Sequence, residues 1–230
     1  MRILAIGAHP DDLEIFCYGL LAAFKARGDE LSLAVATDGA AGTVAGQDDS
    51  LAKRRAEETT TALLKLGAPE LLGLPDGALA TVANGRNVIA EHIRRVTPDL
   101  IVTHDPTDYH TDHRVLSSLI TELAGFSCAV LYADTLMGVG FTPQFYVDIT
   151  AWQAEKQAAI LAHESQVPQR FADGAALLNR FRAAQCNAPD GHYAEAYRTS
   201  ARFPFADIRG LLPAAPPYRP FYVPGSDAFL

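Results

Sequence analysis

Short apolar stretches alternate with helix-like amphipathic stretches through the first 135 residues. The apolar stretches predict strands at 2–7, 31–37, 70–74, 100–103 and 129–133. The stretches between them predict helices at 13–27, 51–66, 88–96 and 112–124. Because parallel strands need crossover connections, this alternation predicts an α/β fold with a mostly parallel sheet and helices on both faces.

The pattern is less regular after residue 135, where it predicts a strand at 145–149 and a helix at 151–163. Without a repeat or a long linker, we expect a single domain over residues 1–230, with its core at about 1–165. The segment 200–230 interleaves prolines with aromatic residues. Prolines exclude a helix and the aromatics argue against a solvated tail, so we expect an extended arm. The arm would pack on its own domain or on a neighbouring subunit, and the second arrangement would make the protein a homo-oligomer.

Composition and charge limit the classes of partner and the location that we expect for the protein. The 230-residue chain is 49% hydrophobic and has a formal net charge of -8 without a basic block, which disfavours nucleic acid. The N-terminal apolar run is too short for a signal peptide, and no apolar stretch reaches the roughly 18 residues of a membrane span. We therefore expect a cytoplasmic protein without a membrane span. The three cysteines have no CxxC spacing and are expected to be small buried residues.

The first polar motif, His9 to Glu14, directly follows the first predicted strand. Asp11 and Glu14 have the spacing of a helix capping box, which is one interpretation. The other is chemical: if Pro10 opens a helical turn, His9 and Asp12 converge on one point, as residues three apart do. Asp11 would then project separately and could act as a general base. The spacing leaves both interpretations open.

The second motif, His110 to His113, follows the fourth predicted strand. Ligands of parallel sheets bind at the carboxyl ends of strands, so the two motifs are expected to face each other. A catalytic zinc site uses three protein ligands and one open position, and the second motif supplies candidates for the third ligand. The other histidines considered, His92, His104 and His192, are expected to lie in surface loops.

Together the two motifs resemble those of the LmbE-like (PIG-L) family of metal-dependent de-N-acetylases: AHPDDLE at 8–14 and PTDYHTDH at 106–113. Weaker matches include Arg55 with Glu58, and the segments 74–77, 163–166 and 193–198. The resemblance implies a Rossmann-like fold. Its implied roles are zinc ligation by His9, Asp12 and His113, general base catalysis by Asp11, assistance to the intermediate or leaving amine by His110, and orientation of a histidine by Asp112.

The resemblance also implies that Arg55, Asp76 and Tyr109 contact the sugar substrate. A solvated helix charge and a turn former are the ordinary interpretations of Arg55 and Asp76. One departure is Ala40, where relatives often carry an acidic residue, and it bears on substrate preference rather than on the metal chemistry.

The expected function is zinc-dependent removal of the N-acetyl group from an N-acetylglucosamine-containing small molecule, with Fe²⁺ as the alternative metal. One alternative function is that of an amidase that cleaves thiol-sugar S-conjugates with the same site. The other is that of a metal- or sugar-binding protein without turnover, which the presence of both Asp11 and His110 disfavours. Dinucleotide binding is disfavoured because the first strand is followed by Gly7-Ala8-His9-Pro10 and not by a GxGxxG turn.

Overall fold

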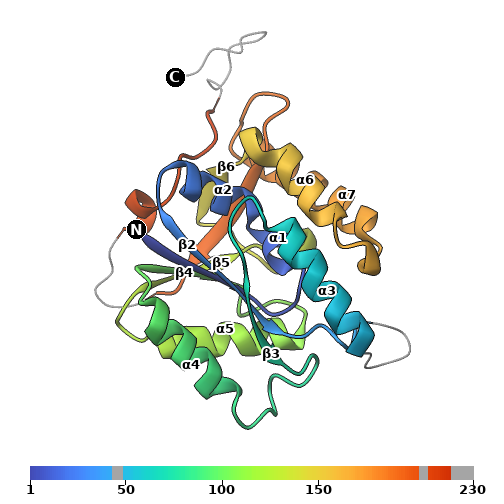
Figure 1. Cartoon of the computed structure of the whole chain (residues 1–230). Coiled ribbons are helices and arrows are strands. Elements are labelled where there is room, and N and C mark those ends of the chain that lie inside the picture. Colours follow the sequence, from blue (N-terminus) through green and yellow to red (C-terminus); the bar gives the residue numbers. More distant parts are fainter. Residues whose placement is uncertain (43–48, 202–206, 219–230) are drawn as a thin grey trace.

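A computed structural model describes residues 1–42, 49–201 and 207–218 (Figure 1). A seven-stranded sheet has the order β3-β2-β1-β4-β5-β7-β6. Its strands are β1 Arg2–Gly7, β2 Glu30–Thr37, β3 Glu70–Leu74, β4 Leu100–Thr103, β5 Ala129–Ala133, β6 Phe145–Asp148 and β7 Ala194–Thr199. The α-helices are α1 Asp12–Phe16, α2 Tyr18–Ala26, α3 Asp49–Ala62, α4 Gly85–Val96, α5 Thr111–Ala124, α6 Gln153–Leu161 and α7 Pro168–Gln185. Short 3-10 helices are η1 Leu136–Gly138, η2 Thr150–Trp152, η3 Glu164–Gln166 and η4 Ile208–Leu211.

The expected α/β fold with a mostly parallel sheet is confirmed. Strands β1 to β5 are parallel to one another, and β7 pairs antiparallel with both β5 and β6. Helices α4 and α5 pack on one face, and α1, α2, α6 and α7 pack on the other (Figure 1). Parallel strands covered on both faces are continuously apolar. This explains why five of the six residues of β1 are buried.

The order of the strands positions the functional loops. The chain runs from β1 outward to β2 and β3, and then crosses to β4 on the other side of β1. The carboxyl ends of β1 and β4 therefore flank the point where the strand order reverses. In open α/β sheets ligands bind at this point. The two polar motifs follow these two strands, so the topology brings them together.

Three sequence expectations need correction. The helix expected at 13–27 is two helices, because Cys17 has a non-helical backbone with φ -145°. The helix expected at 51–66 ends at Ala62. The structured core extends beyond residue 165, since α7 and β7 follow and β7 lies between β5 and β6. Strand β7 carries the buried Glu195, which interrupts the apolar pattern that identifies a buried strand.

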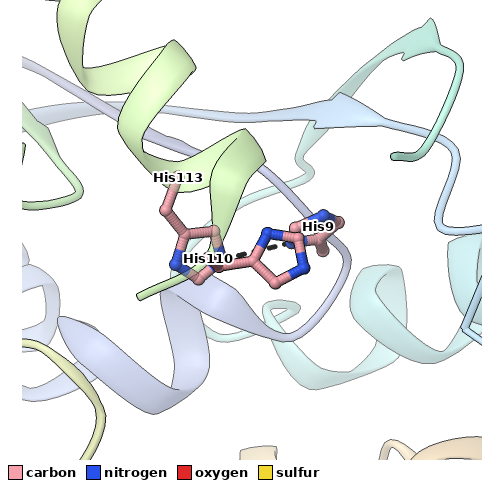
Figure 2. A group of neighbouring side chains, drawn as sticks. All are labelled: His9, His110 and His113. Atoms are coloured by element: carbon pink, nitrogen blue, oxygen red, sulfur yellow. Dashed lines mark hydrogen bonds between the residues drawn. The ribbon is translucent and has the colours of Figure 1, made fainter. Parts of the chain in front are cut away.

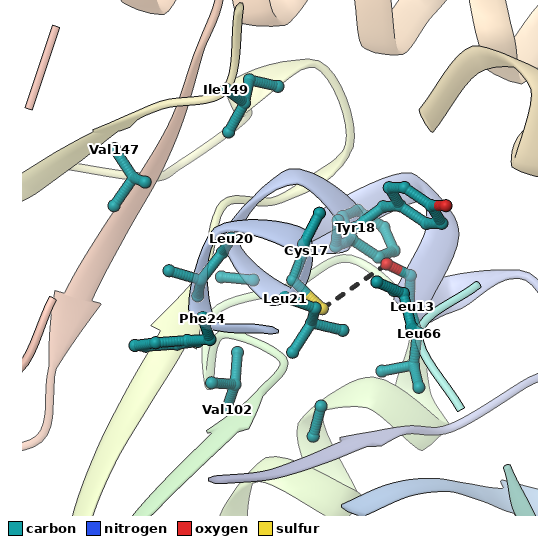
Figure 3. Close-up of a cluster of buried hydrophobic side chains, with 14 of the residues drawn as sticks. Leu13, Cys17, Tyr18, Leu20, Leu21, Phe24, Leu66, Val102, Val147 and Ile149 are labelled. Carbon is teal, nitrogen blue, oxygen red and sulfur yellow. Dashed lines mark hydrogen bonds between the residues drawn. The ribbon is translucent and has the colours of Figure 1, made fainter. Parts of the chain in front are cut away.

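The break at Cys17 lets both short helices face the core (Figure 3). Leu13 from α1 and Leu20, Leu21 and Phe24 from α2 are at most 3% exposed. Cys17 and Cys128 are buried, as expected, whereas Cys186 is partly exposed. Removing a buried leucine of this kind typically costs about 2–5 kcal/mol. The helix that carries Asp12 is therefore held in place by a closely packed core.

Part of the C-terminal arm lies within the described residues. Ile208 and Leu212 are buried in the core cluster, and the Asp148 N–H donates to the Ala214 carbonyl oxygen at 2.9 Å. This part packs on its own domain, while residues 202–206 and 219–230 of the expected arm lie outside the described residues. Over the three described ranges, no helix combines the length and apolar character needed to cross a membrane.

Candidate active site

His9 and Asp12 are brought together by a tight turn between β1 and α1. The Asp12 N–H donates to the His9 carbonyl oxygen at 3.2 Å, and the His9 N–H donates to Asp12 Oδ2 at 2.7 Å. Gly7 permits this turn, because a Cβ at that position would lie 2.8 Å from the Asp12 Cβ. The glycine at the end of β1 therefore allows the Asp12 carboxylate to approach the strand.

His113 joins them from the first turn of α5 (Figure 2). Its Nε2 lies 3.2 Å from His9 Nδ1 and 3.3 Å from Asp12 Oδ1. His9 Nδ1 lies 3.4 Å from Asp12 Oδ2. Ligand atoms around a tetrahedral zinc ion are about 3.3–3.4 Å apart, because its bonds to nitrogen and oxygen are about 2.0–2.1 Å long. His9 and His113 thus lie at about this distance from each other and each from one oxygen of the Asp12 carboxylate, His113 from Oδ1 and His9 from Oδ2.

The other ring nitrogens face carboxylates. His9 Nε2 lies 3.2 Å from Asp76 Oδ1 and 3.5 Å from Asp112 Oδ2, and His113 Nδ1 lies 3.2 Å from Asp108 Oδ1. Carboxylates in these positions fix the tautomer and orientation of metal-binding histidines. Both nitrogens are buried and have no well-aligned hydrogen bond within the described part of the chain. Orphaned polar atoms of this kind are rare in protein interiors, and here each lies on the carboxylate-facing side of its ring, while His9 Nδ1 and His113 Nε2 face each other at 3.2 Å.

The electrostatics also favour a cation. Burial lowers the pKa of His113, but the Asp12 charge and the bond to Asp108 outweigh it and raise this pKa to about 9. Burial likewise opposes protonation of His9, yet Asp112, Asp12 and Asp76 raise its pKa well above the usual value. The surrounding carboxylates therefore stabilise positive charge on both histidine rings.

Other donor combinations exist in the same cluster. Three triads bring donor atoms within 4.8 Å of one another: His9, His110 and His113; Asp12, His104 and His113; and His9, Asp76 and Asp112. His9, Asp12 and His113 also lie 3.2–3.4 Å apart, with the distance to Asp12 measured to Oδ2 from His9 and to Oδ1 from His113. The cluster therefore offers more than one set of donors to a metal.

Asp11 faces the cavity from a strained backbone. Its φ of 121° lies where residues with a side chain are rare, a feature that clusters at functional sites. The side chain makes no capping bond to α1, so the capping-box interpretation is wrong. Glu14 instead accepts bonds from Thr59 and His163. Burial raises the pKa of Asp11 to about 6, although Arg55 opposes this shift.

Arg55 reaches this strained turn from α3. It is 4% exposed, donates to the carbonyl oxygens of Pro10 at 2.7 Å and Gly39 at 3.0 Å, and lies 3.3 Å from Asp11 Oδ2. The interpretation as a solvated helix charge is therefore wrong. The guanidinium braces the Pro10–Asp11 turn and lies on the cavity wall.

His110 caps α5 beside the histidine pair. Its Nδ1 accepts the Asp112 N–H at 3.2 Å, so in the neutral ring the proton resides on Nε2. Its ring centre lies 4.6 Å from that of His9 and 4.8 Å from that of His113. Burial, followed by the neighbouring charges of His9 and His113, lowers the pKa of His110. The ring is thus a neutral N–H donor near pH 7.

These groups line one cavity of about 290 Å³. Asp76 and Tyr109, the other predicted substrate contacts, also line it, with Tyr109 61% exposed. Asp76 Oδ2 accepts the Ala41 N–H at 3.1 Å, which leaves Oδ1 facing His9. The apolar lining residues come from α1, η1 and α7: Ile15, Phe16, Leu136 and Phe171. The cavity therefore combines a polar wall with an apolar wall.

The sequence interpretation missed two polar residues around the histidines. His104 was expected in a surface loop but is 4% exposed and lies 3.0 Å from Asp12 Oδ2 through its Nε2. Asp108 lies beside His113 and was given no role. His104 directly follows β4, so its place at a strand end was the available signal. His92 is also buried, whereas the His192 side chain is 25% exposed.

The chain is similar in sequence to known proteins. The PIG-L family model, described as GlcNAc-PI de-N-acetylase, matches residues 4–124, more than half of the chain. A diacetylchitobiose deacetylase from Thermococcus kodakarensis is 30% identical over 189 residues, which cover 73% of this chain and 71% of the relative.

Solved structures show the same fold. The N,N'-diacetylchitobiose deacetylase from Pyrococcus horikoshii has a TM-score of 0.72 at 24% identity, covering 90% of this chain and 88% of the other. A 4-carboxy-2-hydroxymuconate hydratase from Pseudomonas putida has a TM-score of 0.76 at 20% identity, covering 90% and 99%. The fold thus occurs with different activities, and function must be argued from the site.

Proposed function

This chain belongs to the PIG-L family of de-N-acetylases, and we propose that it is a zinc-dependent hydrolase that removes the N-acetyl group from an N-acetylglucosamine-containing small molecule. The observation that carries the proposal is the spacing of 3.2–3.4 Å among His9 Nδ1, the Asp12 carboxylate and His113 Nε2. Asp11, a carboxylate with a raised pKa, lines the same cavity.

His9, Asp12 and His113 would hold the metal, with Asp76 and Asp112 orienting His9 and Asp108 orienting His113. A bound zinc ion lowers the pKa of water to about 7 and polarises the amide carbonyl. Iron(II) prefers similar ligands, so the donor set leaves zinc and iron as alternatives.

Asp11 is the proposed general base. It accepts a proton on its carboxylate as water attacks the amide carbon, and a pKa of about 6 keeps it ionised at neutral pH. Arg55, 3.3 Å away, holds the carboxylate in place. The proton that Asp11 has accepted can then be delivered to the nitrogen of the leaving amine, which releases acetate and the free amino sugar.

His110 is proposed to stabilise the developing negative charge. Because its Nδ1 accepts the Asp112 N–H, its Nε2–H is the donor available to the carbonyl oxygen. A single oxyanion donor of this kind is typically worth about 10²–10³ in kcat. This assignment uses the neutral imidazole, in agreement with the lowered pKa of His110.

The sugar would bind in the cavity beside Tyr109 and Arg55. Phe171 and Phe16 on the apolar wall suit the apolar face of a sugar ring or its substituent. Asp76 is proposed to act mainly through His9, because its two oxygens already face His9 and Ala41. A cytoplasmic location and a homo-oligomeric state stay predictions.

The proposal is tested by measuring acetate release from a panel of N-acetylglucosamine derivatives. We expect chelated protein to be inactive and stoichiometric Zn²⁺ or Fe²⁺ to restore activity. The panel should include a thiol-sugar S-conjugate, so that release of its amine without acetate identifies the alternative amidase. Failure of every amide to react in metal-loaded protein would overturn the proposal and favour a binding protein or another activity of this fold.

A further inference from the structure

His104 lies behind the proposed metal ligands. It is the first residue after β4, it is 4% exposed, and it does not line the main cavity. It therefore cannot contact a substrate in that cavity. Its ring instead contacts two of the proposed ligands, Asp12 and His113.

The ring of His104 contacts both ligands at once. Its Nε2 lies 3.0 Å from Asp12 Oδ2. Its plane is stacked on His113, with the ring centres 3.7 Å apart and an interplanar angle of 9°. The Phe16 ring lies nearly perpendicular to both rings, with its centre 5.5 Å from that of His104 and 5.8 Å from that of His113. The three rings form one packed block beside Asp12.

The proton on His104 can be assigned from its neighbours. Nε2 lies 3.0 Å from the Ala8 amide nitrogen as well as 3.0 Å from Asp12 Oδ2. One nitrogen cannot accept from the amide and donate to the carboxylate at the same time. A hydrogen bond to an ionised group is roughly twice as strong as a neutral one. The Nε2–H tautomer, which donates to Asp12, is therefore favoured.

His104 is unsuited to ligate the metal together with His113. A nitrogen binds a metal through the lone pair in its ring plane. An ion shared by two parallel rings 3.7 Å apart would lie about 1.8 Å out of each plane, although the bond itself is only about 2.0–2.1 Å long. This geometry excludes the combination of Asp12, His104 and His113 as a ligand set.

We propose that His104 is a positioning residue that prepares Asp12 and His113 to bind the metal, an inference that rests on the proposed function. Asp12 Oδ2 already accepts a hydrogen bond from the His9 N–H at 2.7 Å, and it accepts a second one from His104 Nε2 at 3.0 Å. Oδ1, 3.3 Å from His113 Nε2, is then the oxygen left for the metal. Stacking on His104 fixes the plane of the His113 ring. His104 thus makes Asp12 a ligand through one defined oxygen.

The test separates the hydrogen bond from the stacking. His104→Phe keeps an aromatic ring and loses the donor, whereas His104→Gln keeps a donor and loses the ring. We measure the Zn²⁺ dissociation constant by competition with a chromophoric chelator, and the thermal unfolding of the metal-free proteins. Loss of a partner of this type typically weakens metal binding about 10–100-fold. We expect that loss for His104→Phe and a smaller loss for His104→Gln.

His92→Gln is the matched control, because His92 is 3% exposed but contacts Glu70 and Arg95 rather than the metal site. It should leave zinc affinity unchanged. Once saturated with zinc, the His104 variants should keep kcat within a few-fold of wild type. If His104→Phe bound zinc with wild-type affinity, the inference about His104 would be overturned and the proposed function would not be affected. Complete loss of zinc from both His104 variants would identify a ligand instead, and a wild-type protein that binds no zinc would overturn the proposed function as well.

Discussion

Two groups of buried charged residues differ in how completely their polar atoms are hydrogen-bonded. The first surrounds Glu195 on β7, which is 1% exposed. Its Oε1 accepts the Gly19 N–H at 2.9 Å and the Lys156 ammonium at 2.7 Å. Its Oε2 accepts the Leu20 N–H at 2.7 Å and the Tyr197 hydroxyl at 2.6 Å. Both oxygens are fully bonded, and the group ties β7 to the start of α2 and to α6.

The second group is the proposed metal site, where hydrogen bonding is incomplete. Four of its buried polar atoms have no hydrogen bond from the described residues: His9 Nε2, His113 Nδ1, Asp108 Oδ2 and Asp112 Oδ1. A fully bonded network rigidifies the fold, whereas unpaired buried groups are costly unless a ligand uses them. Burial of charge alone therefore identifies neither kind of site. In the second group, the buried atoms without a hydrogen bond surround two histidines whose other ring nitrogens lie 3.2 Å apart, and this distinguishes it from the bonded network around Glu195.

The largest effect is expected at Asp12. Asp12→Ala should abolish stoichiometric zinc binding, because it removes the only carboxylate of the proposed ligand set. Wild type at a zinc concentration of 100 times its dissociation constant should gain about 2.7 kcal/mol of stability, and the variant should gain none. Metal analysis and unfolding with and without zinc measure this. Asp173→Ala, on the exposed face of α7, is the control, and zinc retained by Asp12→Ala would refute the ligand set.

Asp11→Asn should separate catalysis from metal binding. It removes the proton acceptor while keeping the size of the side chain, so kcat should fall about 10²–10⁴-fold. Zinc content should stay at one ion per chain. Steady-state acetate release and metal analysis on the same sample measure both quantities. Near-normal turnover in this variant would show that another group is the base.

Glu195→Ala should affect stability and spare the metal. It leaves the Lys156 ammonium, 1% exposed, without its counter-charge, which typically costs about 3–5 kcal/mol. Denaturant unfolding measures the loss. The double change of Glu195→Leu with Lys156→Met should recover much of it, because it removes both charges. If Glu195→Ala lost zinc while keeping its stability, the contrast between the two groups would fail.

The pH dependence should be the mildest effect near neutrality. Asp11 must be ionised to accept a proton, and its pKa is about 6 in the absence of a metal. A cation bound beside it lowers this pKa. Activity of zinc-loaded enzyme should therefore be constant with respect to Asp11 above pH 7, and should drop about tenfold per unit only below the lowered pKa. A kcat/KM profile of zinc-loaded enzyme measures this limb, and an acid limb with its midpoint above pH 6 would contradict the assignment of Asp11.

Features that depend on local sequence spacing and on the ends of strands could be predicted from the sequence. The five parallel strands were recognisable from their apolar runs. The meeting of His9, Asp12 and His113 could be predicted from their place at the ends of two of these strands. Arg55 and Glu14 were misread, because their partners lie 45 residues away and only tertiary packing reveals them. His104 and Asp108 lack a motif of their own. Strand β7 was missed because the buried Glu195 breaks its apolar pattern, and its partners are distant in the chain.

The positive φ at Asp11 has an evolutionary consequence. A residue with a side chain in this conformation typically costs about 1–3 kcal/mol, and glycine adopts it freely. Replacement by glycine would relieve the strain and at the same time remove the base. A laboratory selection for heat tolerance that ignores turnover should therefore enrich glycine at position 11, whereas a selection that demands product should never tolerate it.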